Sequence, residues 1–398
     1  MALFQSAAAQ AVNKPTGSTL LSYQELDILH ALRGFCAFYV VVYHAKYILW
    51  SGGTEYLVKF PRATWTPLQY LSFAADISSA AGVGMVIFFF VLSGFFIRYA
   101  QLKKHRATLR FYLNRAVRIY PSYLASLVLG SCVIVYLAHQ HPQLLTTALG
   151  RELNTGLLGT WQEMHLPLAA TAQSLLFLRP GTFFVGYNQV YWSLLPEALF
   201  YLSVPLAFWR VRYYYVLSAA CFLVGTGAVA LHFNTSFFGG YLFTYNAYFA
   251  LGAGLYDVVT RRPGWLAAFR RINGVWLALT LSVLFVVLVA TSALQHPLAT
   301  GPLAAVLAVL SVSVLLAGRV NRQNPVIRLF HEIGIFSFSL YLYHYPLLIL
   351  CYAGLSAMTG ALVIYPRYYW LCIPLVTAGC FALYYVTERP AVRYFRGT

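Results

Sequence analysis

Charged side chains are scarce in this sequence of 398 residues. They make up 9% of it, whereas hydrophobic residues make up 60% and the mean hydropathy is +0.67. About a quarter of the residues in an ordinary soluble domain are charged, so this composition excludes that class of protein. The sequence therefore predicts a multi-pass membrane protein.

Acidic residues are the scarcest, with 10 Asp and Glu against 27 Lys and Arg and a formal net charge of +17. Such an excess can indicate nucleic-acid binding, but here the basic residues are dispersed among loops between apolar runs. Membrane topology and anionic lipid account for that distribution. We therefore expect membrane lipid as a partner and no nucleic acid.

Paired cysteine spacings are absent as well, which excludes a disulfide framework and a cysteine metal site. The six cysteines fall in or beside apolar runs, and we interpret them as packing residues. His139 and His141 are too few ligands for a metal site on their own. We predict no metal.

Long apolar runs are what the sequence does contain. Runs of about 20 residues, enough to cross roughly 30 Å of hydrocarbon, lie near 30–49, 80–99, 121–138, 190–209, 213–231, 237–256, 273–291, 299–317, 333–356 and 366–387. The predicted fold is all-α, a polytopic membrane helix bundle of about ten transmembrane helices.

The distribution of Lys and Arg predicts the orientation, because cytoplasmic loops hold the excess of these residues. With the N-terminus inside, 21 of the 27 lie on the cytoplasmic side, counting Arg33 and Arg98 at helix ends. The outer side holds Lys46, Lys59, Arg62, Arg151, Arg179 and Arg367. Both termini are predicted to be cytoplasmic.

The predicted organisation is one transmembrane domain, 26–388, between a flexible cytoplasmic segment, 1–25, and a cytoplasmic tail, 389–398. The first segment lacks the features of a removable signal peptide. Residues 101–120 have a basic amphipathic pattern that predicts a segment along the inner membrane surface. The outer loop 139–189 is long enough to be functional or locally structured.

Two ionisable residues, Arg33 and His44, lie in the first apolar run, where charge is expensive and commonly marks function. Their separation of eleven residues is about three helical turns, or roughly 16 Å, and returns to nearly the same helix face. An imidazole in that position can act as a general base. Alternatively, Arg33 reaches the inner headgroups and His44 only forms a hydrogen bond within the bundle.

Glu197 is an acid within another apolar run, and Trp192 and Ser193, one turn earlier, could line the same cavity. Glu197 could orient a hydroxyl, pair with an arginine, shuttle a proton or form a structural bond between helices. Pro196 beside it predicts a kink or a local opening of the helix. Ser93-Gly94 predicts a close approach of helices, and we do not propose Ser93 as a nucleophile.

His344, with Tyr341 one turn before it, is a further intramembrane histidine. Such a residue suggests function, although polar packing among tyrosines is the alternative. The sequence therefore offers His44 and His344 as two histidines that could take part in proton transfer.

Five motifs carry a resemblance to a known family: LRGFCAFYVVVYHA at 32–45, FFFVLSGFFI at 88–97, FYLNRAVRIYPSY at 111–123, YWSLLPEALFYL at 191–202 and FSLYLYHYPLL at 338–348. With them the chain resembles the acyltransferase-3 family of membrane-bound O-acyltransferases, over essentially its whole length and in the family's order.

The resemblance implies transfer of an acyl group, expected to be acetyl, from cytoplasmic acyl-coenzyme A to a hydroxyl of a surface or lipid-linked glycan. The bacterial inner membrane is the expected location. His44 would be the general base, or would carry the acyl group itself. Arg33 and Glu197 would complete the catalytic set.

Donor binding is expected at Arg115 and Arg118, which are three residues apart and so share a helix face that could hold phosphates. Contact with lipid headgroups is the alternative for this pair. We expect Trp192, Ser193, Tyr341 and His344 to contact the acceptor.

Two rival functions use the same residues. One is a proton-coupled transporter or flippase in which His44, Glu197 and His344 relay protons. The other is a catalytically silent scaffold in which these residues only fix helix contacts. Binding of acyl-coenzyme A distinguishes the enzyme from the transporter.

Overall fold

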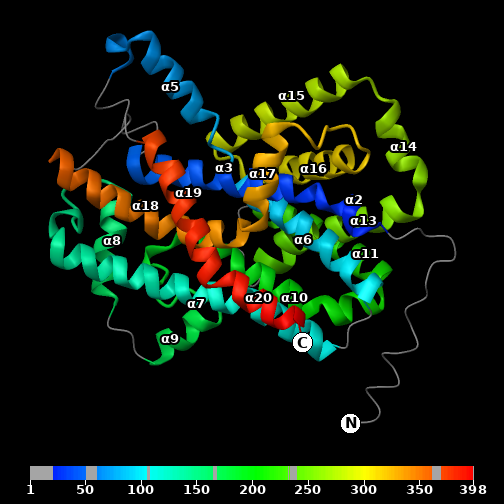
Figure 1. Ribbon diagram of the computed structural model, residues 1–398, viewed down its shortest axis with the longest axis horizontal. Coiled ribbons are helices and arrows are strands. Elements are labelled where there is room, and N and C mark those ends of the chain that lie inside the picture. Colours follow the sequence, from blue (N-terminus) through cyan, green and yellow to red (C-terminus); the bar gives the residue numbers. More distant parts are fainter. Residues whose placement is uncertain are drawn as a thin grey trace. The chain divides into compact units, whose positions relative to one another are not determined.

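The computed structural model describes residues 21–50, 61–104, 108–164, 168–231, 233, 240–360 and 369–397. Helices form most of this part of the chain, and no strand occurs in it (Figure 1). The prediction of an all-α protein is confirmed. The chain divides into two compact units.

Among the described residues, nine helical segments are long and apolar enough to cross a membrane, which agrees with a polytopic bundle. They are Gln24–Leu49, Gln69–Lys103, Thr108–Gln140, Gln189–Trp209, Val211–Ala230, Gly274–Ala293, Leu298–Leu316, Ser337–Thr359 and Trp370–Arg393. The predicted run near 237–256 corresponds to the π-helical turn η5 (Tyr241–Tyr245) and helix α13 (Asn246–Arg261). That segment is not among the nine.

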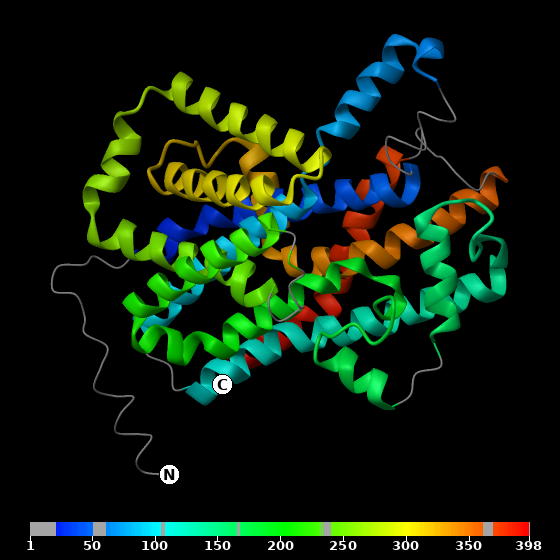
Figure 2. The ribbon, with the colours of Figure 1, turned by 180° about the vertical axis from the view of Figure 1, so that it is seen from behind.

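The first unit comprises Met1–Cys36, Val83–Tyr112 and Pro196–Gly334. Its described elements, in whole or in part, are α2 (Tyr23–Asp27), α3 (Leu29–Trp50), α6 (Gly82–Lys104), α7 (Thr108–Gln140), α10 (Leu194–Trp209), α11 (Val211–Ala230), η5, α13, α14 (Pro263–Arg271), α15 (Gly274–Ala293), α16 (Pro297–Leu316) and α17 (Pro325–Ile335). Helices α15 and α16 lie side by side (Figures 1 and 2).

Helix α15 is a peripheral helix of this unit. Only 17% of its most apolar 18-residue window is buried, and large side chains such as Val283 and Val286 are exposed. Exposed apolar side chains on a spanning helix face lipid, which is as apolar as they are. Much of the apolar surface of α15 is therefore suited to the bilayer.

Helices α6 and α13 approach each other closely through two glycines. A Cβ at Gly94 would lie 2.0 Å from the Phe249 carbonyl oxygen, and one at Gly252 would lie 1.9 Å from the Val91 carbonyl oxygen. Only glycine permits these backbone contacts. The close approach predicted at Ser93-Gly94 is confirmed.

The second unit comprises Ala37–Gly82, Leu113–Leu195 and Ile335–Thr398. Its described helices and turns, besides the remaining parts of α3, α7, α10 and α17, are η1 (Arg62–Thr64), α5 (Pro67–Ile77), η2 (Pro142–Leu144), α8 (Glu152–Gln162), α9 (Leu168–Leu175), η3 (Val185–Tyr187), η4 (Gln189–Ser193), α18 (Ser337–Thr359), α19 (Tyr369–Val386) and α20 (Glu388–Gly397). The most apolar window of α18 is 72% buried, and α18 packs against α19.

Two helix boundaries differ from the prediction. The run 333–356 is interrupted at Phe336, where the backbone leaves the helical region and α17 gives way to α18. Residues 108–120 of the basic segment form the start of α7, which continues without a break to Gln140, while 105–107 lie outside the described residues. Residues 389–397, in the segment predicted as a C-terminal tail, belong to helix α20, for which no structure was predicted.

The outer loop 139–189 is locally structured, as its length predicts. It contains α8 and α9 as well as the turns η2 and η3. All six cysteines are free, and Cys36, Cys372 and Cys380 are buried. The interpretation of Cys132 as a core residue is wrong, because its side chain is exposed.

Candidate functional site

The second unit brings two intramembrane histidines into direct contact. Nδ1 of His44, on α3, lies 2.9 Å from Nε2 of His344, on α18. The two rings stack with their centroids 5.1 Å apart. His344 is fully buried, whereas His44 remains partly accessible. A pair that the sequence separates by 300 residues is thus assembled into one candidate site.

The hydrogen bonds of the pair fix the tautomers when both imidazoles are neutral. Nδ1 of His344 lies 2.8 Å from the carbonyl oxygen of Leu340 and must donate its proton, since a carbonyl only accepts. Nε2 of His344 is then an acceptor, so Nδ1–H of His44 donates to it. This leaves Nε2 of His44 with a free lone pair, which is the form that a general base requires.

Tyrosines surround this pair. The Tyr345 ring contacts His44 at a centroid distance of 5.1 Å, and the Tyr43 ring contacts it at 5.0 Å. The Tyr341 ring lies 6.3 Å from that of His344. The aromatic side chains place both histidines in a largely apolar environment that retains a few hydroxyl groups.

Three of the four predicted acceptor-contacting residues are neighbours. The Ser193 hydroxyl, at the end of η4, lies 2.7 Å from the Tyr341 hydroxyl, and the Tyr341 ring is adjacent to His344. Trp192, also on η4, is half-buried beside Ser193. The sequence motifs at 191–202 and 338–348 therefore meet in this unit.

Hydrogen bonds to the backbone of α18 hold η4 in place. The Asn188 amide donates to the Leu342 carbonyl at 2.9 Å, and the Ser126 hydroxyl of α7 donates to the same oxygen at 2.9 Å. Such side-chain donors satisfy backbone groups that have no access to water in a membrane. Asn188 and Ser126 thus fix the position of Ser193 indirectly.

The predicted donor-binding pair, Arg115 and Arg118, lies in the first half of α7, and both side chains are half-buried. The Arg115 guanidinium donates to the Asn114 side chain at 2.5 Å. Their spacing of three residues on one helix places them on neighbouring positions of the helix surface, as predicted.

Arg33 lies in the first unit, half-buried, on the same uninterrupted helix α3 that carries His44 further along. The single-helix spacing of these residues is confirmed. A Cβ at Gly34, directly after Arg33, would lie 1.8 Å from the carbonyl oxygen of Phe330. The backbone at Arg33 is therefore held tightly against α17.

Glu197 belongs to a second polar group, also in the first unit. Its carboxylate accepts a short hydrogen bond from the Tyr201 hydroxyl, which lies 3.2 Å from the Ser93 hydroxyl. This chain joins the motif at 191–202 to the one at 88–97. It supports both a structural and a direct role for Glu197.

The kink predicted at Pro196 is wrong. Pro196 is the third residue of α10, which begins at Leu194 after the 3₁₀ turn η4. In the first turn of a helix no N–H is needed for the internal hydrogen bonds, so proline fits without distortion. The chain changes from 3₁₀ to α at this point.

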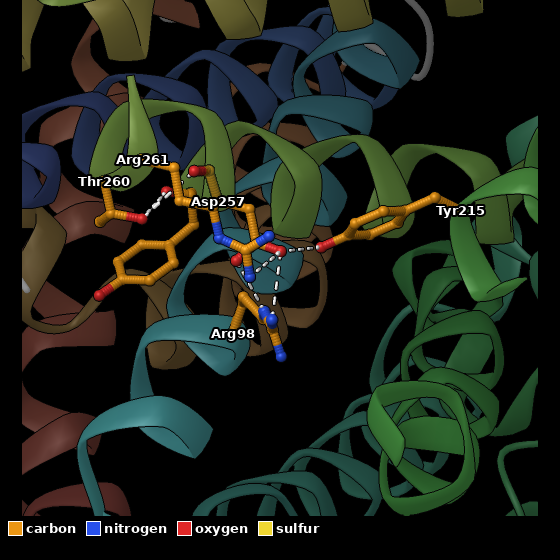
Figure 3. A network of polar contacts seen from close by, with 6 residues as sticks. Arg98, Tyr215, Asp257, Thr260 and Arg261 are labelled. Atoms are coloured by element: carbon orange, nitrogen blue, oxygen red, sulfur yellow. Dashed lines mark hydrogen bonds and ion pairs between the residues drawn. The ribbon is translucent and has the colours of Figure 1, made fainter. Parts of the chain in front are cut away.

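A buried ion pair between Arg98 and Asp257 was not predicted from the sequence. Arg98 Nε and NH2 lie 2.9 and 3.1 Å from the two carboxylate oxygens of Asp257, and both residues are buried. The Tyr215 hydroxyl donates to the same carboxylate at 3.0 Å, as Figure 3 shows. An Asp between apolar residues of a helix requires such partners, and that signal was present in the sequence.

Two further buried charges were not predicted as such, because Arg151 was expected only as an outer-side residue and Asp76 was not singled out. Arg151 is 2% exposed and donates to the Ile48 carbonyl at 3.0 Å near the end of α3. Asp76, at the end of α5, is 1% exposed, and its carboxylate lies 3.7 Å from Lys46 Nζ. Arg151 thus joins the start of α8 to α3, and Asp76 joins the end of α5 to α3.

Within the part of the chain that the structure describes, no group of three or more His, Cys, Asp or Glu residues could hold a metal ion. His105, His165 and His232 lie outside that part.

Comparison with known proteins adds one positive finding. A family model described as an acyltransferase domain matches residues 26–385. No curated protein and no solved structure matches the chain. The matched range includes every residue of the candidate site.

Proposed function

The chain belongs to the acyltransferase-3 family and is a multi-pass membrane acyltransferase, and from this premise we propose that it is an O-acyltransferase. It moves an acyl group, expected to be acetyl, from cytoplasmic acyl-coenzyme A to a hydroxyl of a surface or lipid-linked glycan. We place it in the bacterial inner membrane with both termini in the cytoplasm. The resemblance carried by the five sequence motifs is confirmed at the level of the family.

The contact between His44 and His344 carries this proposal. In the neutral pair, Nε2 of His44 has a free lone pair, and the residue as a whole is partly exposed. His44 takes the proton of the acceptor hydroxyl as its oxygen forms a bond with the thioester carbonyl carbon. The C–S bond then breaks, and the coenzyme A sulfur receives the proton from His44.

His344 acts through His44 in this proposal. Once His44 is protonated, its Nδ1–H still donates to Nε2 of His344, and the Leu340 carbonyl still holds the other side of the His344 ring. The hydrogen bond thus keeps the orientation of the His44 ring throughout the cycle. It also stabilises the positive charge that develops on His44, because Nε2 of His344 accepts from the protonated ring. General-base catalysis of this kind contributes about 10²–10⁴ to the rate.

The donor is held by its phosphates at Arg115 and Arg118, and Arg33 contributes to the path of the donor toward His44. Guanidinium groups bind phosphate oxygens in two-point contacts. Trp192, Ser193 and Tyr341 contact the acceptor, and Glu197 serves as a polar group of the catalytic set. His344, predicted from the sequence to contact the acceptor as well, is assigned here to the support of His44, to which it is hydrogen-bonded. In the alternative two-step route, Nε2 of His44 first forms a bond with the acyl carbon as the C–S bond breaks, and the coenzyme A thiol leaves. The acceptor oxygen then attacks the acyl-histidine, the N–C bond breaks and His44 is regenerated.

The test is binding of acetyl-coenzyme A to the purified protein in detergent, measured by calorimetry at several salt concentrations. We expect wild type to bind and Arg115→Ala/Arg118→Ala to lose most of the affinity. The control, Arg262→Ala/Arg271→Ala, removes two exposed basic residues elsewhere in the chain and should bind like wild type. Absence of binding to folded wild type would contradict the proposal and favour the proton-coupled transporter or flippase.

A second measurement separates enzyme from scaffold. Vesicles that contain the protein should transfer label from acetyl-coenzyme A to membrane glycans, and His44→Ala should abolish the transfer at unchanged protein abundance. His296→Ala replaces an exposed histidine and should retain wild-type transfer. Unchanged labelling in His44→Ala would exclude His44 as the base.

A further inference from the structure

The hydroxyl group of Tyr345 is buried and has no hydrogen-bond partner among the described residues. Tyr345 follows His344 on α18 and is 0% exposed. Buried hydroxyls nearly always find a partner, so a lone one calls for an explanation. The neighbouring Tyr343 follows the rule, because its hydroxyl donates to the Ser122 carbonyl at 3.1 Å and contacts the Thr387 hydroxyl at 2.9 Å.

The position of Tyr345 distinguishes it from the other unpartnered buried hydroxyls. Its ring contacts that of His44, with centroids 5.1 Å apart, and lies 6.1 Å from the ring of Tyr187 in the outer loop 139–189. Tyr47, one turn beyond His44 on α3, lies within hydrogen-bond distance of Tyr187, hydroxyl to hydroxyl at 3.3 Å. Tyr345 therefore lies between the histidine pair and a pair of tyrosines whose hydroxyls satisfy each other.

The groups that interact electrostatically with Tyr345 are other tyrosines and one acid, namely Tyr187, Tyr47, Tyr43 and Glu152. These polar groups lie on the side of His44 that is predicted to face outward. Tyr47 follows His44 toward the C-terminal end of α3, and Tyr187 and Glu152 belong to the outer loop 139–189. An acceptor that arrives from the outer side would meet these groups first.

The backbone beneath Tyr187 is also unusual. Gly186 and Tyr187 both have positive φ, 68° and 53°, a conformation that is uncommon for a tyrosine. Tyr187 is nevertheless buried, at 1% exposure. Backbone strain of this kind persists where the surrounding structure holds a side chain in a required position.

We propose that the Tyr345 hydroxyl is an acceptor-binding group of the active site. It donates a hydrogen bond to an oxygen atom of the acceptor, next to the acceptor hydroxyl from which His44 removes the proton. The inference rests on the proposed function and names one group that selects a sugar acceptor over water. The bonds formed and broken are those of the transfer step above, and Tyr345 keeps its own proton throughout.

The test compares two reactions of the same donor in native membrane vesicles, which carry the cell's own glycans and lipid-linked glycans. With labelled acetyl-coenzyme A, one measures label transferred to membrane material and label released as acetate, which reports transfer to water. Tyr345→Phe removes only the hydroxyl. We expect transfer to fall about tenfold, the effect of losing one hydrogen bond, while release of acetate is unchanged.

Tyr343→Phe is the matched control, since it deletes a fully buried hydroxyl on the same helix that already has partners. It should lower the melting temperature and leave the ratio of transfer to release unchanged. Tyr345→Phe should instead leave the melting temperature unchanged, because no hydrogen bond within the protein is lost.

Two outcomes of this test would overturn the inference about Tyr345, and a third would overturn the proposed function. Equal losses of transfer and acetate release in Tyr345→Phe would overturn the inference and place the hydroxyl on the thioester carbonyl oxygen, which both reactions share. Wild-type rates of both reactions in this variant would overturn it in favour of a packing role. If wild type neither transfers nor releases acetate, the proposed function itself fails, which is a different result from either.

Discussion

His44 donates a hydrogen bond from Nδ1 to Nε2 of His344 when both rings are neutral, across 2.9 Å and 300 residues of sequence. This is the arrangement of an imidazole base whose N–H donates a hydrogen bond to a second, orienting group. A neutral imidazole replaces the carboxylate that often has this place. Such a partner orients the ring and keeps the reactive nitrogen free of a proton.

The first prediction concerns the unequal roles of these two histidines. His44→Ala should lower acyl transfer by at least about 10², because the group that takes the proton is lost. His344→Gln should lower kcat by a smaller factor than His344→Ala, since an amide oxygen can still accept from Nδ1–H of His44. Transfer rates at saturating acetyl-coenzyme A measure this order.

Protein abundance and melting temperature provide the control for the histidine variants. The order of kcat values should persist among variants that are equally stable. If His344→Gln and His344→Ala were equally inactive at equal stability, the hydrogen bond to His44 would not explain the role of His344.

The buried ion pair in the first unit gives a prediction about stability. Arg98→Met should destabilise the protein by about 3–5 kcal/mol, because it leaves the Asp257 carboxylate buried without its main partner. Arg261, 3.7 Å from the same carboxylate, and the Tyr215 hydroxyl should reduce this cost toward the lower end. Thermal unfolding in detergent measures it.

The double variant Arg98→Met/Asp257→Leu is the informative comparison. Removing both charges should recover most of the stability lost in either single variant, as replacement of buried pairs by apolar residues often does. A double variant that is as unstable as the sum of the single variants would show that the two residues act independently.

The helical architecture could be predicted from the sequence because apolar length and charge placement decide it. The break at Phe336 could not, since the run of apolar residues continues through it and only the local backbone changes. The unbroken course of α7 was missed because the basic amphipathic pattern of 101–120 gives way to an apolar run at 121–138 and so suggested two separate segments.

The candidate site was predicted only as separate residues. The motifs indicate that His44, His344 and Tyr341 are important, but helix periodicity does not report which helices pack together. Contacts such as that of His44 with His344 depend on the tertiary arrangement within the second unit. Asp257 lies between apolar residues of a helix, which is a signal of a buried acid, but the sequence does not identify its partner Arg98, 159 residues away.

The third prediction tests the charge of Glu197. Glu197→Gln should lower acyl transfer by about tenfold or more, a loss of about 1.4 kcal/mol in transition-state stabilisation. The melting temperature should change little, because the amide oxygen can still accept from Tyr201. Transfer assays and thermal unfolding of the same preparations give both quantities.

Tyr201→Phe separates charge from hydrogen bonding at this position. It leaves the Glu197 carboxylate in place and removes the hydroxyl that links it to Ser93. We expect a lower melting temperature and a smaller loss of transfer than in Glu197→Gln. Full activity in Glu197→Gln would mean that Glu197 serves only the contact between helices.

The last prediction concerns the close approach of α6 and α13. Gly94→Ala should destabilise the first unit, because the added Cβ would lie 2.0 Å from a carbonyl oxygen of Phe249 and the helices must move apart. Gly227→Ala is the matched control, since a Cβ there meets nothing within 4 Å. Alanine is the better helix former by about 1 kcal/mol, so Gly227→Ala should be neutral or stabilising. Equal melting temperatures for the two variants would show that the α6–α13 contact yields easily, and that Gly94 is replaceable.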